Sequence, residues 1–390
     1  MLKTAYRASS VVLLGGVIVA LCTQIPVPAA SQAPSAATTR VVTAANAFLS
    51  LLDATQTPKA KYAYTDPIKS KWHNLPPGMA GRAGIRLKEL TPPQREAAEA
   101  VVRAVLSGYG ERKVQSIMAA DKYLGEKMGS NVGTGPDGYM LAIFGSPSAT
   151  EPWEVQFNGH HLGVNVTIVG AAHVLAPTLT AAYPNIYTDG DRKVVVLADE
   201  ADRALMLLNS LDAAQRARTI QTAQIWDFLL GPGKDGQVLQ PEGLKASDMT
   251  AAQKALLLDL TAAWVNIIDD QAAAAKMAEV RKNLDNTYFL WSGDTTVSGR
   301  AYFRVQGPTV WIEYSPQTVG GPGSIGGGGG RRGDGARGGD GAGGGDAARG
   351  GRGNFGAVLN DPNRQLDPTH VHTVYRDFTN DYGKAFASPF

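Results

Sequence analysis

The order of strand and helix patterns along the chain is the feature that most constrains its fold. A first group of strand patterns, over 139–144 and 153–169, predicts a hairpin interrupted by Gly145-Ser-Pro-Ser148. A second group covers 287–291 and 301–314 and turns at Gln306-Gly307-Pro308. A helical block separates the two groups, and a last strand is predicted over 370–377. Strands interleaved with helices in this order predict a single α+β domain, with an antiparallel or mixed sheet packed against the helical block.

Apolar residues at helical spacing predict helices over 41–55, 92–107, 212–230 and 250–283. Three of these helices begin with a capping signal, in which a Thr or Asp is followed three positions later by a glutamine. The pairs are Thr91 with Gln94, Asp212 with Gln215, and Thr250 with Gln253. Because their spacings along the chain are unequal, they indicate three separately capped helices and not a solenoid repeat.

Glycine is concentrated in one tract. Of the 45 glycines, 19 lie between Gly320 and Gly353, and we predict a disordered Gly/Arg-rich insertion over 320–356 between two strands. Such an insertion is tolerable because the cost of closing a loop grows slowly with its length. Its arginines resemble an RNA-contacting tract, but three aspartates and only Phe355 for stacking favour a flexible linker. The net charge of +2 likewise argues against a nucleic-acid partner.

The first 30 residues have the pattern of a secretory signal peptide. Lys3 and Arg7 precede an apolar run over 11–22, and small residues suitable for cleavage lie near Ala29. We therefore predict a secreted or periplasmic protein with no stable membrane insertion after cleavage, and an uncleaved or lipidated anchor is the alternative. The single cysteine, Cys22, would leave with this segment, which excludes disulfides and cysteine-based metal sites from the mature chain.

Common catalytic signatures are absent from the sequence. It contains no Gly-x-Ser-x-Gly, no Ser-x-x-Lys, no His-Glu-x-x-His and no phosphate-binding loop motif. The segment 189–200 has the length of an EF-hand loop, but Lys193 stands at a ligand position and Val194 at the position that requires glycine. The histidines are therefore the strongest remaining candidates for a functional site.

His370 and His372 lie two positions apart in the predicted last strand. Alternate residues of a strand share a face about 6.6 Å apart, a separation that suits two imidazoles on one metal ion. The pair His160-His161 is the natural source of a third ligand. Alternation through 153–169 places His161 on the polar face, whereas a bulge near Gly159 would bring His160 there instead. We expect a divalent metal, zinc first, with copper or iron as alternatives, although histidines without a metal in a polar cleft, or purely structural histidines, also fit this pattern.

Two further residues are candidates for catalysis. Glu313 lies in an otherwise apolar strand and would serve as a general base or fourth ligand, or simply pair with Arg304 or Arg376. Arg376 shares a strand face with the two histidines and would bind an anionic group. These residues suggest a metal-dependent enzyme acting on a small molecule, with hydrolysis the first expectation and metal-dependent oxidation a variant. The alternative is a non-catalytic exported protein that binds a small ligand.

Three stretches of the sequence resemble the uncharacterised family DUF3500. They are 152–162 with its His-His-Leu motif, 302–313, and 370–383 with His-x-His followed by Arg376-Asp377, and the segment 210–216 fits as well. The resemblance covers the chain from about residue 40 to the end and implies one domain. The glycine-rich tract departs from the family pattern, which supports an insertion. The family has no established activity, so the resemblance points to the same histidines without implying a reaction.

Overall fold

The computed structural model describes residues 35–76, 79, 81–129, 135–318 and 366–386. The predicted signal peptide and the predicted insertion over 320–356 lie outside these residues. The described part is an α+β domain whose helices are α1 (Ala36–Ser50), α2 (Thr57–Ala60), α3 (Pro92–Val105), α4 (Gly108–Lys127), α5 (Ala198–Asn209), α6 (Ala213–Thr219), α7 (Ala251–Val265) and α8 (Asp270–Lys282). None of them is long and apolar enough to cross a membrane.

Twelve of the described strands form one mixed sheet. Its first half contains β1 (Lys61–Tyr62), β2 (Ile85–Arg86), β3 (Met140–Phe144), β4 (Trp153–Gly159), β5 (Leu162–Val169), β6 (Ala172–Leu175) and β7 (Thr178–Ala182). Its second half contains β10 (Leu244–Lys245), β11 (Tyr288–Gly293), β12 (Ala301–Gly307), β13 (Val310–Thr318) and β14 (Leu366–Arg376). A separate hairpin consists of β8 (Ile186–Asp189) and β9 (Arg192–Val195). Among the described strands of this sheet, β1 and β3 are the one parallel pair, so the predicted antiparallel or mixed sheet is confirmed.

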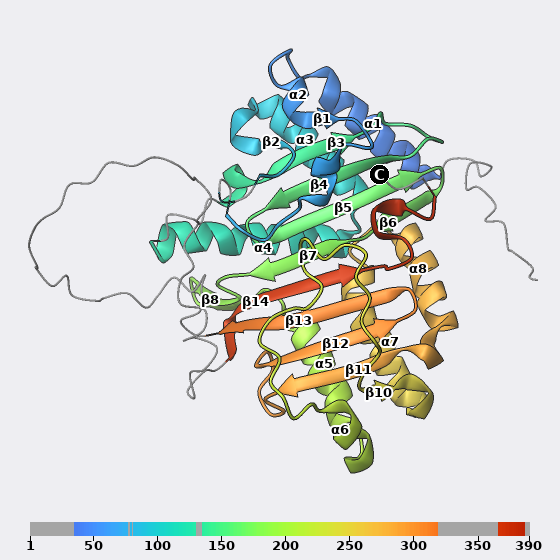
Figure 1. Ribbon diagram of the computed structural model, residues 1–390. Coiled ribbons are helices and arrows are strands. Elements are labelled where there is room, and N and C mark those ends of the chain that lie inside the picture. The colour runs from blue at the N-terminus through green and yellow to red at the C-terminus, as the bar shows by residue number, and fades with distance from the viewer. Residues whose placement is uncertain (1–34, 77–78, 80, 130–134, 319–365, 387–390) are drawn as a thin grey trace, which may run out of the picture.

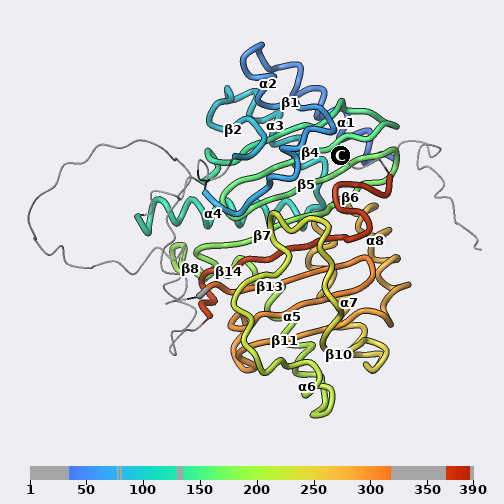
Figure 2. Tube along the Cα trace, viewed as in Figure 1, coloured from blue at the N-terminus to red at the C-terminus, as the bar shows by residue number. Residues whose placement is uncertain are grey.

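The two faces of the sheet are covered differently. Helices lie behind the sheet in the view of Figure 1, and their buried apolar side chains form the main core with the strands. The opposite face, which we call the loop face, is crossed by two long connections, 63–84 and 221–243 (Figure 2). A smaller apolar cluster lies under these connections and includes Trp72, Leu230, Trp311 and Val374.

The order of the strands is the same from either edge to the centre. The first half has the order β2-β3-β4-β5-β7, and the second half has the corresponding order β10-β11-β12-β13-β14. The halves meet at the centre of the sheet, where β7 and β14 form an antiparallel pair. Behind the sheet, Leu106 pairs with Ile268 in an isolated bridge at the start of α4 and α8. The domain is therefore built from two similar halves related by an approximate two-fold axis.

The same side-chain contacts recur in both halves. Gln94 in α3 and Gln253 in α7 each donate to a backbone carbonyl 43 residues earlier in the chain and to a glutamine 38 residues earlier. Each half also has an ion pair spanning 30 residues, Lys59–Glu89 in the first and Arg218–Asp248 in the second. All three predicted capping boxes are present, and they belong to this duplicated arrangement.

Two predicted helices were too long. The helix predicted over 212–230 ends at Thr219, because Ile220 bridges to Trp291 and the chain then runs across the loop face. The helix predicted over 250–283 is two helices, α7 and α8. The backbone N–H of Asp269 donates to Val105 across the approximate two-fold axis, and its side chain caps α8. The sequence patterns missed α4 and α5 altogether. Tertiary contacts therefore decided where these helices begin and end.

The strand predicted over 153–169 is in fact two strands, β4 and β5. Gly159 pairs with Leu162, so His160 and His161 form the two-residue turn between them. The alternation of faces that we used to choose between these histidines does not run through this turn. The predicted turn at 306–308 does join two strands, since Gly307 pairs with Val310. The last strand, predicted over 370–377, corresponds to the longer β14, which begins at Leu366 and ends at Arg376.

Candidate metal centre

The turn between β4 and β5 holds His161 in an unusual backbone conformation. His161 has φ of 63°, in the left-handed region that few side chains adopt without supporting contacts. Its N–H donates to Asn74 O at 3.2 Å, and its carbonyl accepts from Ala181 N at 2.8 Å. Gly159 allows the turn to lie against Tyr139, since a Cβ at this position would come within 2.3 Å of the tyrosine ring. The turn is thus held by contacts on both sides.

The other two histidines come from β14, in the centre of the sheet. His372 pairs with Ala181 of β7, the same residue that donates to the carbonyl of His161. His370 lies two positions away on the same face of the strand, which is the loop face. The sheet register therefore brings the turn of the first half against the central strand of the second half.

The Nε2 atoms of the three histidines converge. His370 Nε2 lies 3.2 Å from His161 Nε2 and 3.0 Å from His372 Nε2. Ligand nitrogens at the usual zinc distance of about 2.0–2.1 Å stand about 3.3 Å apart in a tetrahedron, close to these values. We call His161, His370 and His372 the histidine trio, and their geometry is suitable for holding a metal ion.

The trio is buried and its imidazoles are kept neutral. Loss of water contact lowers the pKa of His370 to about 4 and holds the pKa values of His161 and His372 well below the ordinary value. No carboxylate belongs to the group that the described residues place here. Neutral imidazole is the form that binds metals, because protonation occupies the donor lone pair. A metal ion is therefore a partner that this arrangement suits.

The sequence as a whole identifies the family. A family model described as "Protein of unknown function (DUF3500)" matches residues 34–384. The chain belongs to the DUF3500 family. No curated protein and no solved structure matches it.

Three side chains that the sequence patterns did not indicate surround the trio of this DUF3500 chain. The ring of Tyr183 lies 4.6 Å from that of His370, and the ring of Phe228 lies 5.8 Å from that of His372. Asn74 Nδ2 lies 3.4 Å from His372 Nδ1. Asn74 and Phe228 come from the two connections that cross the loop face, so no spacing in the sequence relates them to the histidines.

His160, the alternative metal ligand, lies beside the trio and outside it. Its Nδ1 is 2.6 Å from Asp121 Oδ1, and its ring stacks on that of His161 at 3.9 Å. Both His160 and Asp121 are buried. Asp121, in α4, thus forms a hydrogen bond with His160, and the ring of His160 packs against the ring of His161.

Glu313, predicted as a base or fourth ligand, has a different set of contacts. Its two oxygens accept four hydrogen bonds, from Leu229 N, Leu230 N, Tyr302 Oη and Trp311 Nε1, all between 2.7 and 2.9 Å. Neither arginine expected as its partner makes this contact, since Arg304 pairs with Glu242. These contacts favour a structural role, in which Glu313 holds the 221–243 connection on the sheet.

Arg376, predicted to bind an anionic group, is also fully engaged. Its guanidinium donates to Leu230 O, Gly231 O, Asp235 Oδ1 and Asp381 Oδ2 at 2.7–2.9 Å. Only 1 % of the side chain is exposed. Like Glu313, Arg376 has the contacts of a residue that fixes the 221–243 connection, and the structure gives it no contact with the trio.

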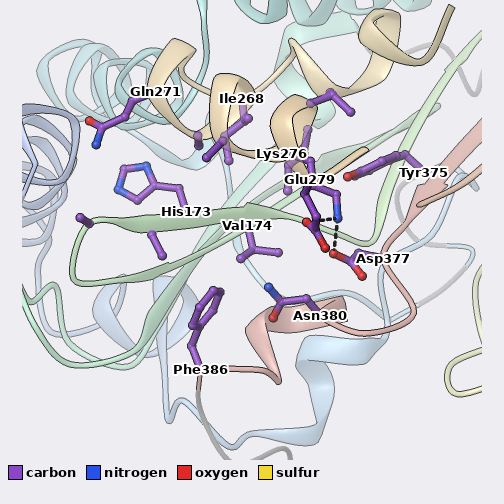
Figure 3. Close-up of a pocket in the computed structure, with 16 residues that line it drawn as sticks. His173, Val174, Ile268, Gln271, Lys276, Glu279, Tyr375, Asp377, Asn380 and Phe386 are labelled. Atoms are coloured by element: carbon purple, nitrogen blue, oxygen red, sulfur yellow. Dashed lines mark hydrogen bonds and ion pairs between the residues drawn. The ribbon is translucent and has the colours of Figure 1, made fainter. Parts of the chain in front are cut away.

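A separate polar cluster lies in a cleft between β6 and α8, with a volume of about 300 Å³ (Figure 3). Lys276 Nζ lies 2.6 Å from Asp377 Oδ2 and 3.0 Å from Glu279 Oε2. Further along the cleft, His173 Nδ1 is 2.7 Å from Asp269 Oδ2. Val174 and Ile268 line the space between these polar groups. The cleft therefore combines polar ends with an apolar middle.

Proposed function

We propose that this protein is a metal-dependent hydrolase whose divalent ion, zinc first, is bound by His161, His370 and His372. The observation that carries the proposal is the convergence of three buried, neutral imidazoles on one point through their Nε2 atoms. Buried polar atoms ordinarily have partners that match them. Three facing Nε2 atoms are best matched by one cation that accepts all three lone pairs.

The ligand set supports hydrolysis as the first choice of reaction. If His161, His370 and His372 held zinc, the ion would supply the chemistry of hydrolysis, since zinc held by three histidines activates a water molecule near neutral pH. The same ligands also suit copper or iron, for which oxidation would be the reaction. Because Glu313 and Arg376 are engaged elsewhere, we leave both out of the proposed mechanism. The proposed substrate is a small molecule, and no nucleic-acid partner is proposed.

Metal analysis of the purified chain tests the proposal. The wild type should hold close to one zinc ion per chain after loading and dialysis, whereas His370→Ala and His372→Ala should hold none. His173→Gln is the matched control, because His173 is a buried histidine outside the trio that pairs with Asp269. A wild type that retains neither zinc, copper nor iron would disprove the metal centre.

A second candidate function is non-catalytic binding of a small ligand, and the cleft of Figure 3 favours it. Hydrolysis of a panel of chromogenic esters, phosphate esters and amides distinguishes the two functions. Turnover that depends on zinc and is lost in His372→Ala supports the enzyme. A zinc-loaded protein that turns over none of them, but whose melting temperature rises with an amphipathic small molecule, supports the binding protein.

We further propose that the protein is exported, on the strength of the charged and apolar pattern in residues 1–30. Cleavage should leave a mature chain that begins near residue 30 or 31. The intact mass of the protein from the culture fluid or periplasm measures this directly, and a full-length mass in the cytoplasm would contradict it.

A further inference from the structure

Asn74 contacts two of the three histidines of the trio. Its backbone carbonyl accepts the N–H of His161 at 3.2 Å, at the residue with positive φ. Its side-chain Nδ2 lies 3.4 Å from Nδ1 of His372, on the side of that ring opposite to the proposed metal. One residue of the 63–84 connection therefore contacts ligands from both halves of the sheet.

Arg82 fixes the backbone on either side of Asn74. Its guanidinium donates to the carbonyls of His73 at 2.9 Å and of Leu75, the two neighbours of Asn74. The same Nη1 atom donates to Gly159 O at 2.7 Å, just before the turn that carries His161. Arg82 is buried. The backbone of Asn74 is thus held relative to the turn by one buried side chain with three carbonyl acceptors.

The side-chain amide of Asn74 also determines which ring nitrogen of His372 carries the proton and which has a lone pair for a metal ion. A histidine that binds a metal through Nε2 carries its proton on Nδ1, and this proton needs an acceptor. The amide oxygen and nitrogen of asparagine have nearly the same shape, and their assignment follows from the hydrogen-bond network. With Oδ1 facing His372, Asn74 accepts Nδ1–H and leaves the Nε2 lone pair free. With Nδ2 facing it, as the amide is oriented in this structure, the proton must be on Nε2. Metal binding through Nε2 therefore requires the amide to be turned by about 180°, which exchanges its oxygen and nitrogen.

We infer that Asn74 is a positioning residue of the metal centre, which holds His372 in the tautomer and orientation that bind the ion. The inference rests on the proposed metal site and goes beyond it, since no sequence motif indicates Asn74. Hydrogen-bond acceptors behind metal-binding histidines are typically worth 10- to 100-fold in metal affinity. The backbone contact to His161 does not depend on the side chain, so substitutions of Asn74 leave it in place and test the side-chain contacts, to His372 and to the neighbouring His73.

Two substitutions separate the acceptor from the shape of the side chain. Asn74→Leu keeps a similar volume without an acceptor, whereas Asn74→Asp offers only acceptors. We expect the zinc affinity, measured by chelator competition, to fall about 10- to 100-fold in Asn74→Leu and to stay at or above the wild-type value in Asn74→Asp. The visible absorption spectrum of the cobalt-loaded protein should change in Asn74→Leu and remain tetrahedral in Asn74→Asp. Asn209→Leu, at an exposed position of α5, is the matched control.

The possible outcomes separate this inference from the metal site itself. A wild type that binds no metal disproves the proposed function and the inference with it. A wild type that binds zinc, together with Asn74→Leu of equal affinity and unchanged cobalt spectrum, overturns the inference alone. Equal losses in Asn74→Leu and Asn74→Asp also overturn it, because the acceptor would then be irrelevant. Urea unfolding of the metal-free variants checks that each one folds.

Discussion

At the scale of single residues, the buried charges on the loop face have more than one partner each. Arg376 divides its guanidinium between two backbone carbonyls and two carboxylates, those of Asp235 and Asp381. Asp381 therefore shares the guanidinium of Arg376 with Asp235. A second negative charge, on Asp377, lies nearby. Burial raises the pKa of Asp381 to about 6, against the opposing effect of Arg376. This carboxyl thus titrates at a higher pH in the folded chain than in the unfolded one.

The raised pKa of Asp381 predicts a pH-dependent stability. Between pH 4 and 6 the unfolded chain has lost this proton and the folded chain still holds it, so the free energy of unfolding falls as the pH rises. A shift of this size corresponds to roughly 3 kcal/mol at most. Urea unfolding between pH 4 and 6.5 should show a shallower pH dependence for Asp381→Asn than for the wild type. The same slope in both proteins would contradict this, and Asp191→Asn, at an exposed position, is the control.

At the scale of elements, the two helix pairs behind the sheet meet backbone to backbone. Ser107 N donates to Ile267 O and Asp269 N donates to Val105 O, both at 3.1 Å. This reciprocal contact brings the first turn of α4 against the end of α7. Gly110 is required at the point of contact, because a Cβ there would lie 2.0 Å from Ile267 O. The two halves can approach this closely on the helix side because Gly110 has no side chain.

A pair of glycine substitutions in α4 tests this contact. Gly110→Ala should lower the free energy of unfolding by roughly 1–3 kcal/mol or more, since the added methyl group meets backbone that has no room to move. Gly108→Ala is matched to it in the same helical turn, where the added Cβ meets only the end of a flexible arginine at 3.5 Å. It should be neutral or stabilise the helix by up to about 1 kcal/mol. Equal effects of the two substitutions in chemical unfolding would refute the close contact.

At the scale of the whole molecule, the histidine trio joins the two halves of the domain. His161 belongs to the β4–β5 turn of the first half, and His370 and His372 belong to β14 of the second. The corresponding turn of the second half, between β12 and β13, has Pro308 and Thr309 in place of two histidines. The approximate two-fold symmetry of the fold therefore does not extend to the site, and one metal centre per chain is expected.

Because its ligands come from both halves, the proposed metal should stabilise the entire fold. A ligand at 100 times its dissociation constant adds about 2.7 kcal/mol to the free energy of unfolding. Saturating zinc should therefore raise the melting temperature of the wild type by several degrees, and a chelator should reverse the effect. His161→Ala should show no zinc-dependent shift, whereas His173→Gln should show the same zinc-dependent shift as the wild type. A similar shift in His161→Ala would place the bound zinc elsewhere.

Several features of the site could be predicted from the sequence. The two-residue spacing of His370 and His372 within a strand is sufficient to place both rings on one face. The His160-His161 pair was identified as the source of a third ring, but the reasoning from strand alternation was wrong, because these residues form a turn. The duplication was visible in part, since Leu49-Ser-Leu-Leu-Asp-Ala-Thr-Gln56 resembles Leu208-Asn-Ser-Leu-Asp-Ala-Ala-Gln215, yet we interpreted the capping signals as unrelated helices.

Local sequence patterns were enough to predict the class of the fold, the capped helix starts and the pair of histidines on one strand, because these features depend on residues close together in the chain. Long-range packing is what brings His161 to this pair, places Asn74 behind His372, and gives Glu313 and Arg376 other partners. These contacts connect segments far apart in sequence, and they depend on the register between β7 and β14 and on two connections packed over the sheet. Local sequence patterns contain no information about distances between such segments, so these contacts can be seen only in the folded chain.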